Sequence, residues 1–187
     1  MLTAAAYDIH VHQLLERMRK FHACMHQAGI PYRIVGGMAT FIQVSEKDPL
    51  EGRLTRDIDA AVRREDLQRI IQAAERCGFR YKHAAGVDML LDAQTPKARS
   101  AIHLIFLGEK VNEDYLEPVP NSPAVTTKEG ILLAPVRDLV LMKLTSFRMK
   151  DRVHIQDMDR VGLITPEIEA DLPEPLRQRL AEVRASR

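Results

Sequence analysis

The spacing of hydrophobic residues predicts a helix, a strand and a second helix at the start of the chain. From Ile9 to Met25 the hydrophobic residues recur at steps of three to five, which is the pattern of one buried face of an amphipathic helix. Gly29 follows where such a helix ends, because glycine readily adopts the backbone conformation that terminates helices. Residues 31–37 then predict a short strand that runs into a glycine turn, and residues 38–44 predict the second helix.

Beyond the second helix, the pattern predicts a polar loop, four strands and one more helix. The helix has acidic residues in its first turn and a glycine at its end, which are typical signals of helix boundaries. The strands are short hydrophobic runs bounded by glycine or polar residues. The loop is expected at residues 45–56, the helix at 64–77, and the strands at 57–62, 80–85, 87–92 and 100–108.

A stretch with four prolines, residues 118–135, separates these elements from a part that reads as helical to its end. This order of elements predicts an α/β (α+β) fold, in which a β-sheet flanked by helices is followed by a C-terminal helical segment. We expect residues 1–118 to form the α/β core with its N-terminal helix. Residues 119–187 are expected to add linker strands and the helical segment, packed on the core as one compact unit.

The composition excludes some classes of protein. The chain has 187 residues, 45% of them hydrophobic, which is enough to bury one substantial core. Its 27 basic and 26 acidic residues nearly cancel, so we expect no binding of nucleic acid through overall charge. No hydrophobic run approaches the roughly 20 residues that cross a bilayer, and the N-terminus turns polar too soon for a signal peptide. A soluble, cytoplasmic protein without a membrane partner is expected.

The two cysteines, Cys24 and Cys77, are far apart in sequence and lie in segments that read as helical. Their spacing matches neither a CxxC motif nor a disulfide framework. We therefore expect buried free thiols.

Two consecutive glycines, Gly36 and Gly37, stand between the first predicted strand and the second helix. Residues without side chains let backbone amides approach a ligand closely, and a helix that begins there directs free N–H groups toward an anion. The turn therefore suits the phosphates of a nucleotide. The alternative is a turn that glycine serves only by its geometry.

Two aspartates, Asp57 and Asp59, are separated by one residue on a predicted strand. Side chains alternate along a strand, so both carboxylates project from one face and can bind a hard divalent cation. Such a pair is costly to bury without a cation or hydrogen-bond donors. The alternative is an exposed strand end where the aspartates pair with Arg53 or Arg56.

Taken together, the glycine turn into a helix, the Arg-x-Thr loop and the Asp-x-Asp strand resemble the core of the DNA-polymerase-β-like nucleotidyltransferase superfamily. The segment LLAPVRDLVLMKLTSFRMKDRVHIQDM, residues 132–158, resembles the corresponding segment of AbiE-type and MenT-type toxin nucleotidyltransferases and their uncharacterised relatives. The resemblance covers roughly residues 30–160. It implies a nucleotidyltransferase-like mixed β-sheet flanked by helices.

The resemblance also implies the roles of the site residues. Asp57 and Asp59 would hold Mg²⁺ or Mn²⁺, and both would be catalytic together with Lys143 and Asp151. The residues expected to bind the nucleotide are Gly36, Gly37, Thr40, Arg53, Thr55, Lys143 and Arg148, with Lys150 as an alternative to Arg148.

Helical spacing supports a joint role for Lys143 and Asp151. Phe147 and then Lys150 or Asp151 follow Lys143 at helical spacing, so a cation and a carboxylate can share one face. The alternatives are a solvated Lys143 beside a hydrophobic stripe, and an Asp151 that caps the next helix. His154 is expected either near the Lys143 face or in contacts within the helix pair.

One residue departs from the superfamily pattern, which has a third carboxylate on a neighbouring strand. Here that strand reads AIHLIF, with His103 at the expected position. Imidazole can ligate a metal or act as a general base near neutral pH, but it carries no negative charge. Three interpretations stay open: His103 serves as catalytic residue and metal ligand; Asp88, Asp92 or Glu109 supplies the charge; or transfer activity is lost and nucleotide binding kept.

The sequence thus predicts an enzyme that transfers a nucleoside monophosphate from a nucleoside triphosphate to a tRNA, protein or small-molecule acceptor. The alternative is a catalytically silent module that binds a nucleotide or a partner. A toxin role with an antitoxin partner is a further prediction. The sequence does not indicate an oligomeric state.

Overall fold

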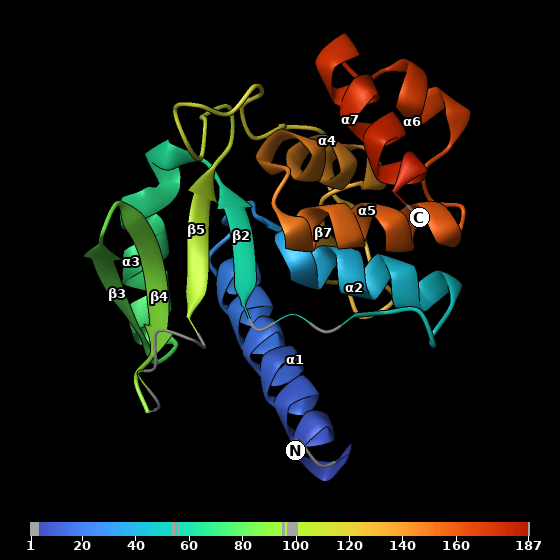
Figure 1. Ribbon diagram of the computed structural model, residues 1–187. Helices are drawn as coiled ribbons and strands as arrows, with labels where there is room; N and C mark the ends of the chain where they lie inside the picture. The colour runs from blue at the N-terminus through green and yellow to red at the C-terminus, as the bar shows by residue number, and fades with distance from the viewer. Residues whose placement is uncertain (1–3, 54, 56, 95, 97–100, 187) are drawn as a thin grey trace.

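The structure is a computed structural model that describes residues 4–53, 55, 57–94, 96 and 101–186. Helices and strands alternate in its first part, and helices follow at the C-terminus (Figure 1). The first part contains α1 (Ala4–Gln27), β1 (Arg33–Val35), α2 (Gly36–Lys47), β2 (Ile58–Val62), η1 (Arg64–Asp66), α3 (Leu67–Arg76), β3 (Phe79–Ala84), β4 (Val87–Asp92) and β5 (Ile102–Phe106). The second contains β6 (Val125–Thr126), β7 (Leu132–Leu133), α4 (Val136–Ser146), α5 (Met149–Arg160), α6 (Pro166–Ala170) and α7 (Glu174–Ala185).

The strands form one seven-stranded mixed sheet in the order β3-β4-β5-β2-β1-β7-β6. The pairs β2–β5 and β1–β7 are parallel, and the other neighbours are antiparallel. Because β7 pairs with β1, the proline-rich stretch of residues 118–135 joins the sheet built by the first half of the chain. The expected α/β fold class with a mixed sheet and a C-terminal helical segment is confirmed.

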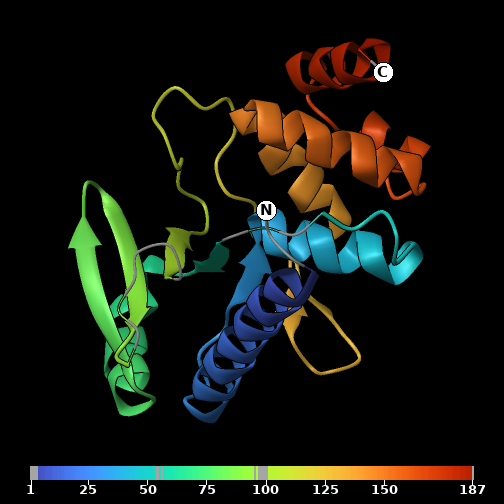
Figure 2. The ribbon, with the colours of Figure 1, turned by 60° about the horizontal axis from the view of Figure 1, so that its bottom comes forward.

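Helices cover the two faces of the sheet differently. Helices α1 and α3 pack together on one face, and α2, α4 and α5 lie over the other face at its β1 end (Figures 1 and 2). The side chains of β2 and β5 point alternately to the two faces. On the face covered by α1 and α3 the buried residues are Ile58, Ala60, Ile102 and Leu104. The residues between them point to the second face, where the candidate site lies.

The helical spacing that placed Lys143 and Asp151 on one face does not hold, because the chain turns at Phe147 between them. This residue has a left-handed backbone conformation (φ 49°) and ends α4, and α5 begins two residues later. Arg179 of α7 donates to the carbonyl oxygens of Leu144 and Thr145 at 2.7 and 2.9 Å, where the last turn of α4 lacks intrahelical partners. The Arg179 guanidinium also lies 4.9 Å from the centre of the Phe147 ring.

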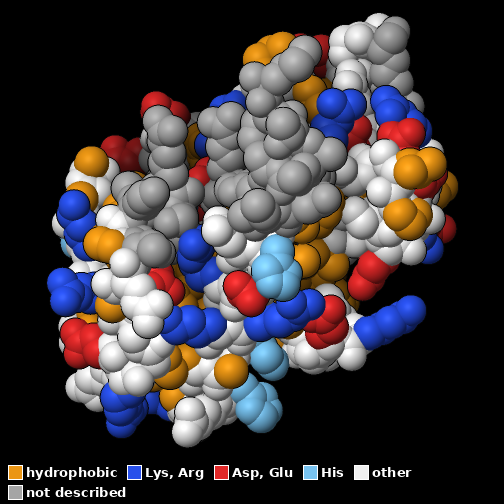
Figure 3. Space-filling view, turned by 90° about the horizontal axis from the view of Figure 1, so that it is seen from below, with side chains coloured by type: hydrophobic (Ala, Val, Ile, Leu, Met, Phe, Trp, Pro, Cys, Tyr) orange, Lys and Arg blue, Asp and Glu red, His pale blue; other side chains and the backbone are white. Residues whose placement is uncertain are grey.

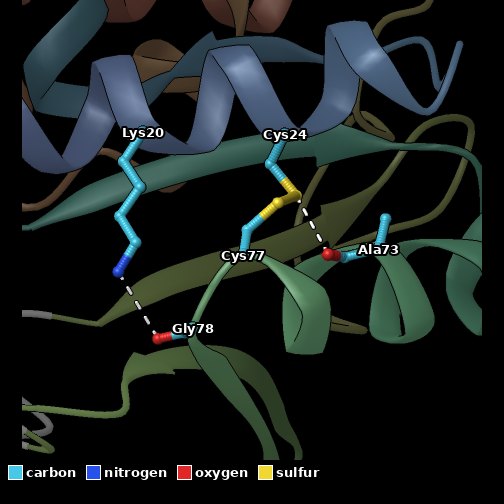
Figure 4. Close-up of a disulfide and its surroundings, with 5 residues drawn as sticks. All are labelled: Lys20, Cys24, Ala73, Cys77 and Gly78. Atoms are coloured by element: carbon cyan, nitrogen blue, oxygen red, sulfur yellow. Dashed lines mark hydrogen bonds between the residues drawn. A yellow bond between two sulfur atoms is a disulfide. The ribbon is translucent and has the colours of Figure 1, made fainter.

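The expectation of free thiols is also wrong, because Cys24 of α1 and Cys77 at the end of α3 form a disulfide (Figure 4). Their Cα atoms are 6.1 Å apart although 53 positions separate them in sequence. The Cys24 sulfur also lies 3.1 Å from the carbonyl oxygen of Ala73. Sequence spacing could not reveal the pair, because only the packing of α1 on α3 brings the cysteines together.

The surface shows a mixture of charges that agrees with the balanced composition. On the face in Figure 3, lysine and arginine side chains are interspersed with acidic, histidine and hydrophobic ones. Among the described helices, none is long and apolar enough to span a membrane.

Candidate functional site

A cavity of about 340 Å³ lies between the second face of the sheet and helices α4 and α5. The segment that follows β5 forms part of its wall and extends toward these two helices (Figure 2). The lining residues are Val35, Gly36, Gly37, Thr55, Asp57, Asp59, His103, Ile105, Val111, Tyr115, Glu117, Pro118, Val119, Met142, Lys143, Thr145, Ser146, Arg148, Lys150, Asp151 and His154. The cavity thus brings together most of the residues that the sequence indicated.

The two glycines begin α2, and each has a neighbour that leaves no room for a side chain. Gly36 has a left-handed backbone (φ 65°), and a Cβ on it would lie 2.2 Å from Oδ2 of Asp59. A Cβ on Gly37 would lie 2.7 Å from the hydroxyl oxygen of Thr55. No side chain caps this helix start, so the first N–H groups of α2 have no side-chain partner at the cap. Backbone conformation and the position of Asp59 therefore favour glycine at residue 36, and the position of Thr55 favours it at residue 37.

The two aspartates lie at the N-terminal end of β2. Asp57 immediately precedes β2 and Asp59 is its second residue, and both line the cavity as strand alternation predicts. The Asp57 amide donates to the Thr55 hydroxyl at 3.4 Å, which ties the preceding loop to the strand. Both aspartates are half-buried.

His103 pairs with Asp59 across the parallel strands β2 and β5, where the two residues are in register. The His103 Nδ1 lies 3.3 Å from Oδ1 of Asp59, and this hydrogen bond raises the pKa of the imidazole. The ring therefore faces the carboxylate, and the role of Asp57, Asp59 and His103 as metal ligands stays a prediction. Among the described residues, no group of three or more histidine, cysteine, aspartate or glutamate side chains is arranged to hold a metal ion.

The alternative sources of a third carboxylate are not at the cavity. Asp88 accepts a hydrogen bond from Tyr81 and pairs with His83, Asp92 pairs with Lys20 at 3.0 Å, and Glu109 pairs with Arg64 at 2.5 Å. These three acidic residues are described, and none of them lines the cavity. The position of these residues therefore gives no support to the interpretation that one of them supplies the missing charge.

Lys143 is at the centre of a network on the helical side of the cavity. Its ammonium group lies 2.8 Å from Nδ1 of His154 and 3.5 Å from Oδ1 of Asp151. Burial lowers the pKa of Lys143 to about 8, against the attraction of Asp151. Burial together with the nearby Lys143 charge lowers the pKa of His154 to about 4. Near neutral pH the pair is therefore a lysine cation beside a neutral imidazole.

Asp151 takes part in capping α5 and also lines the cavity. It is the third residue of α5, and its carboxylate accepts from the backbone N–H of Arg148 at 3.3 Å in a capping box. It also accepts from the Arg148 side chain at 2.6 Å and from Ser146 at 2.8 Å. Burial alone would raise the pKa of Asp151, but the hydrogen bond from Arg148 and the charge of Lys143 lower it.

Two residues expected to bind the nucleotide lie elsewhere. The buried Thr40 hydroxyl donates to the carbonyl oxygen of Gly36 at 3.0 Å, inside α2. Arg53 pairs at 2.8 Å with the buried Asp157 of α5. Neither lines the cavity. The sequence also suggested Arg53 or Arg56 as a partner of the aspartates. Arg53 instead pairs with Asp157, and Arg56 lies outside the described residues.

His154 of α5 lines the cavity beside Lys143, which is one of the two places expected for it. Other lining residues were not predicted. Tyr115 and Glu117 belong to the irregular segment after β5, where no hydrophobic period marks a functional position.

Comparison with solved structures identifies the fold. An antigenic nucleotidyltransferase-like protein from Paracoccidioides brasiliensis matches with a TM-score of 0.57 at 16% identity, over 94% of this chain and 88% of that protein. The chain has a nucleotidyltransferase-like fold. The crystal structure of ANT(2'')-Ia in complex with adenylyl-2''-tobramycin matches with a TM-score of 0.54 at 12% identity, over 91% of this chain and 97% of that one. No family model and no curated protein matches the sequence.

Proposed function

We propose that this protein is a metal-dependent nucleotidyltransferase. The observation that carries the proposal is the convergence of the α2 start, Asp57, Asp59 and Lys143 on one cavity of a nucleotidyltransferase-like fold. Phosphoryl transfer depends mainly on positioning and on stabilising negative charge, and these residues suit both tasks. The reaction is the attack of an acceptor oxygen on the α-phosphorus of a nucleoside triphosphate, with release of pyrophosphate.

The donor set fits a magnesium or manganese ion. Mg²⁺ is commonly held by one or two carboxylates together with waters and substrate phosphates, so a third protein ligand is not required. Asp57 and Asp59 provide two carboxylates on the cavity wall. A metal bound there supplies Lewis-acid stabilisation of the phosphate oxygens.

The remaining residues bind the triphosphate and move a proton. The N–H groups at the start of α2 and the cations of Lys143, Arg148 and Lys150 attract the phosphates. His103 directs Nδ1 toward Asp59, so in the neutral form of the ring Nε2 is free to accept the proton of an attacking hydroxyl. A histidine thus takes the place that a carboxylate has in the superfamily pattern.

A transfer assay tests the proposal. Purified protein is incubated with each of the four labelled nucleoside triphosphates, with Mg²⁺ or Mn²⁺, and with tRNA, protein and small-molecule acceptors. We expect labelled product with one acceptor class and its loss in Asp57→Asn and in Asp59→Asn. Lys82→Gln, a change on β3 away from the cavity, is the matched control and should leave transfer intact. Undiminished transfer in both the Asp57→Asn and the Asp59→Asn variants would contradict the proposal.

A catalytically silent nucleotide-binding module is the second candidate, and His103 favours it. His103 adds no negative charge and occupies one oxygen of Asp59. Calorimetry that detects nucleotide binding in a protein without turnover would support this candidate. If turnover is absent because the third carboxylate is missing, His103→Asp should create metal-dependent transfer. In an active enzyme that uses His103 as its base, the same substitution should reduce transfer.

The finer resemblance to AbiE-type and MenT-type toxins extends the proposal to a biological role. Its basis is the segment of residues 132–158, which includes Lys143 and Asp151. Under this proposal, expression inhibits bacterial growth, the antitoxin partner relieves the inhibition, and a tRNA is the acceptor. A growth assay with wild type and Asp59→Asn checks it, since unchanged growth with an active wild-type enzyme contradicts a toxin role.

A further inference from the structure

His154 of α5 lies in the cavity wall, and nothing in the proposed chemistry has used it so far. Its Nδ1 is 2.8 Å from Nζ of Lys143, the shortest contact that the described residues make with this buried ammonium group. The charged groups around the ring are Lys143, Asp151, Lys150 and Arg53.

The contact with Lys143 determines which ring nitrogen carries the proton. An ammonium group has three N–H donors and cannot accept a hydrogen bond, so Nδ1 of His154 must be the acceptor. A neutral imidazole that accepts at Nδ1 has its proton on Nε2. Lys143 therefore makes Nε2–H of His154 a hydrogen-bond donor.

The donor is available to a ligand in the cavity. Nε2 has no hydrogen-bond partner among the described residues. The fully buried side-chain atoms that lack a partner do not include it, so Nε2 is accessible. The neighbouring ring atom Cε1 lies 3.5 Å from where a Cβ on Gly37 would be, against the start of α2. The ring therefore borders the place where the helix N–H groups and Lys143 attract phosphate.

We propose that His154 is a phosphate-binding residue whose Nε2–H donates to the phosphate chain of the bound nucleotide, and that Lys143 positions it by holding its tautomer. The inference rests on the proposed nucleotide-binding function and adds a specific donor to it. Lys143 then acts twice, as a cation for the phosphates and as the donor that orients the imidazole. A neutral donor at this place adds a hydrogen bond without a further charge beside the buried lysine.

Calorimetry with three probes tests the inference: a non-hydrolysable nucleoside triphosphate, the matching nucleoside, and inorganic tripolyphosphate, each with Mg²⁺. In His154→Asn the side chain can still accept from Lys143 but has no donor at the Nε2 position. We expect it to weaken binding of the triphosphate and of tripolyphosphate by about 10- to 100-fold, which corresponds to one hydrogen bond to a charged group. Nucleoside binding should not change, and His154→Gln, whose amide reaches farther, should recover part of the lost affinity.

His22→Asn is the matched control, because His22 also uses Nδ1 for a side-chain contact, with Tyr32 at 2.7 Å, but lies outside the cavity. It should leave tripolyphosphate binding unchanged. Long-range ¹H–¹⁵N NMR of the free protein should find the His154 proton on Nε2, and a proton on Nδ1 would overturn the inference.

The two proposals fail in different ways. If wild type binds no nucleotide, the proposed function fails, and this inference fails with it. If wild type binds the triphosphate and His154→Asn binds it equally well, or loses nucleoside affinity to the same extent, only the role of His154 is refuted.

Discussion

At the residue scale, Gly36 and Asp59 depend on each other. The carboxylate of Asp59 occupies the space that a side chain on residue 36 would need, and Gly36 has a backbone conformation that favours glycine. The same glycine opens the helix that faces the phosphates. One position thus sets both the direction of the carboxylate and the approach of the ligand to the backbone.

We therefore predict that Gly36→Ala damages the protein more than the equivalent change at Gly29. Gly29 has nearly the same backbone conformation (φ 61°), but a Cβ on it would have no atom within 4 Å, so Gly29→Ala carries only the backbone cost of about 1–2 kcal/mol. Gly36→Ala adds a clash with Asp59. Urea denaturation should give the larger loss of unfolding free energy for Gly36→Ala, and nucleotide affinity should fall only in this variant. Equal losses in both variants would argue against the packing of Asp59 on Gly36.

At the scale of elements, the turn between α4 and α5 assembles the cationic wall of the cavity. Lys143 belongs to α4, whereas Asp151 and His154 belong to α5, and the left-handed Phe147 lets the two helices face each other. Arg179 of α7 holds the end of α4 through two carbonyl oxygens. The terminal helix therefore supports a site that it does not line.

Arg179→Gln is predicted to destabilise the protein and to weaken nucleotide binding. The lost bonds come from a charged donor to the negative end of a helix, so the expected loss is about 2 kcal/mol. Differential scanning calorimetry should show a decrease in Tm of about 4–8 °C for a domain of this size. The matched control is Arg177→Gln on the same helix, where the arginine contacts Glu174 and the carbonyl oxygen of Ala170 at the surface. A control that loses as much stability as Arg179→Gln would exclude a specific role for the α4 contacts.

At the scale of the whole molecule, the sheet joins the two halves of the chain, and the disulfide joins two of the helices that cover it. The hydrophobic core is continuous from α1 through the sheet to α7. The bond between Cys24 and Cys77 holds α1 to the end of α3, on the face opposite the cavity. Its loss should therefore affect stability more than ligand binding.

Replacing both cysteines by serine should lower the free energy of unfolding by up to about 4 kcal/mol, the chain-entropy value for a cross-link across 53 residues. Dithiothreitol should lower the Tm of wild type and leave that of the double variant unchanged, and nucleotide affinity should be the same in both proteins. Mass spectrometry after alkylation under non-reducing conditions checks the bond directly. Two alkylated cysteines in the native protein would contradict it. Because disulfides are rare in reducing compartments, the same measurement in cells bears on the predicted cytoplasmic location.

The sequence by itself determined most of the elements, the fold class and the residues of the sheet side of the cavity. The spacing of hydrophobic residues is a local signal, and so are the glycines and acidic residues at the ends of helices. Such signals can be interpreted without knowing what packs against them. The glycine pair and Asp57 with Asp59 were found because each is a short motif with its own chemistry. His103 was found because it departs from a pattern.

Only the tertiary structure decided what depends on distant residues. It showed that Arg53 and Thr40 are engaged elsewhere, that His103 faces Asp59, and that Cys24 meets Cys77. It also turned the chain at Phe147, which brings Lys143 of α4 into contact with Asp151 and His154 of α5. The physical reason is that packing between helices and strands determines which side chains meet. The spacing of hydrophobic residues along one element carries no information about the element that packs on it.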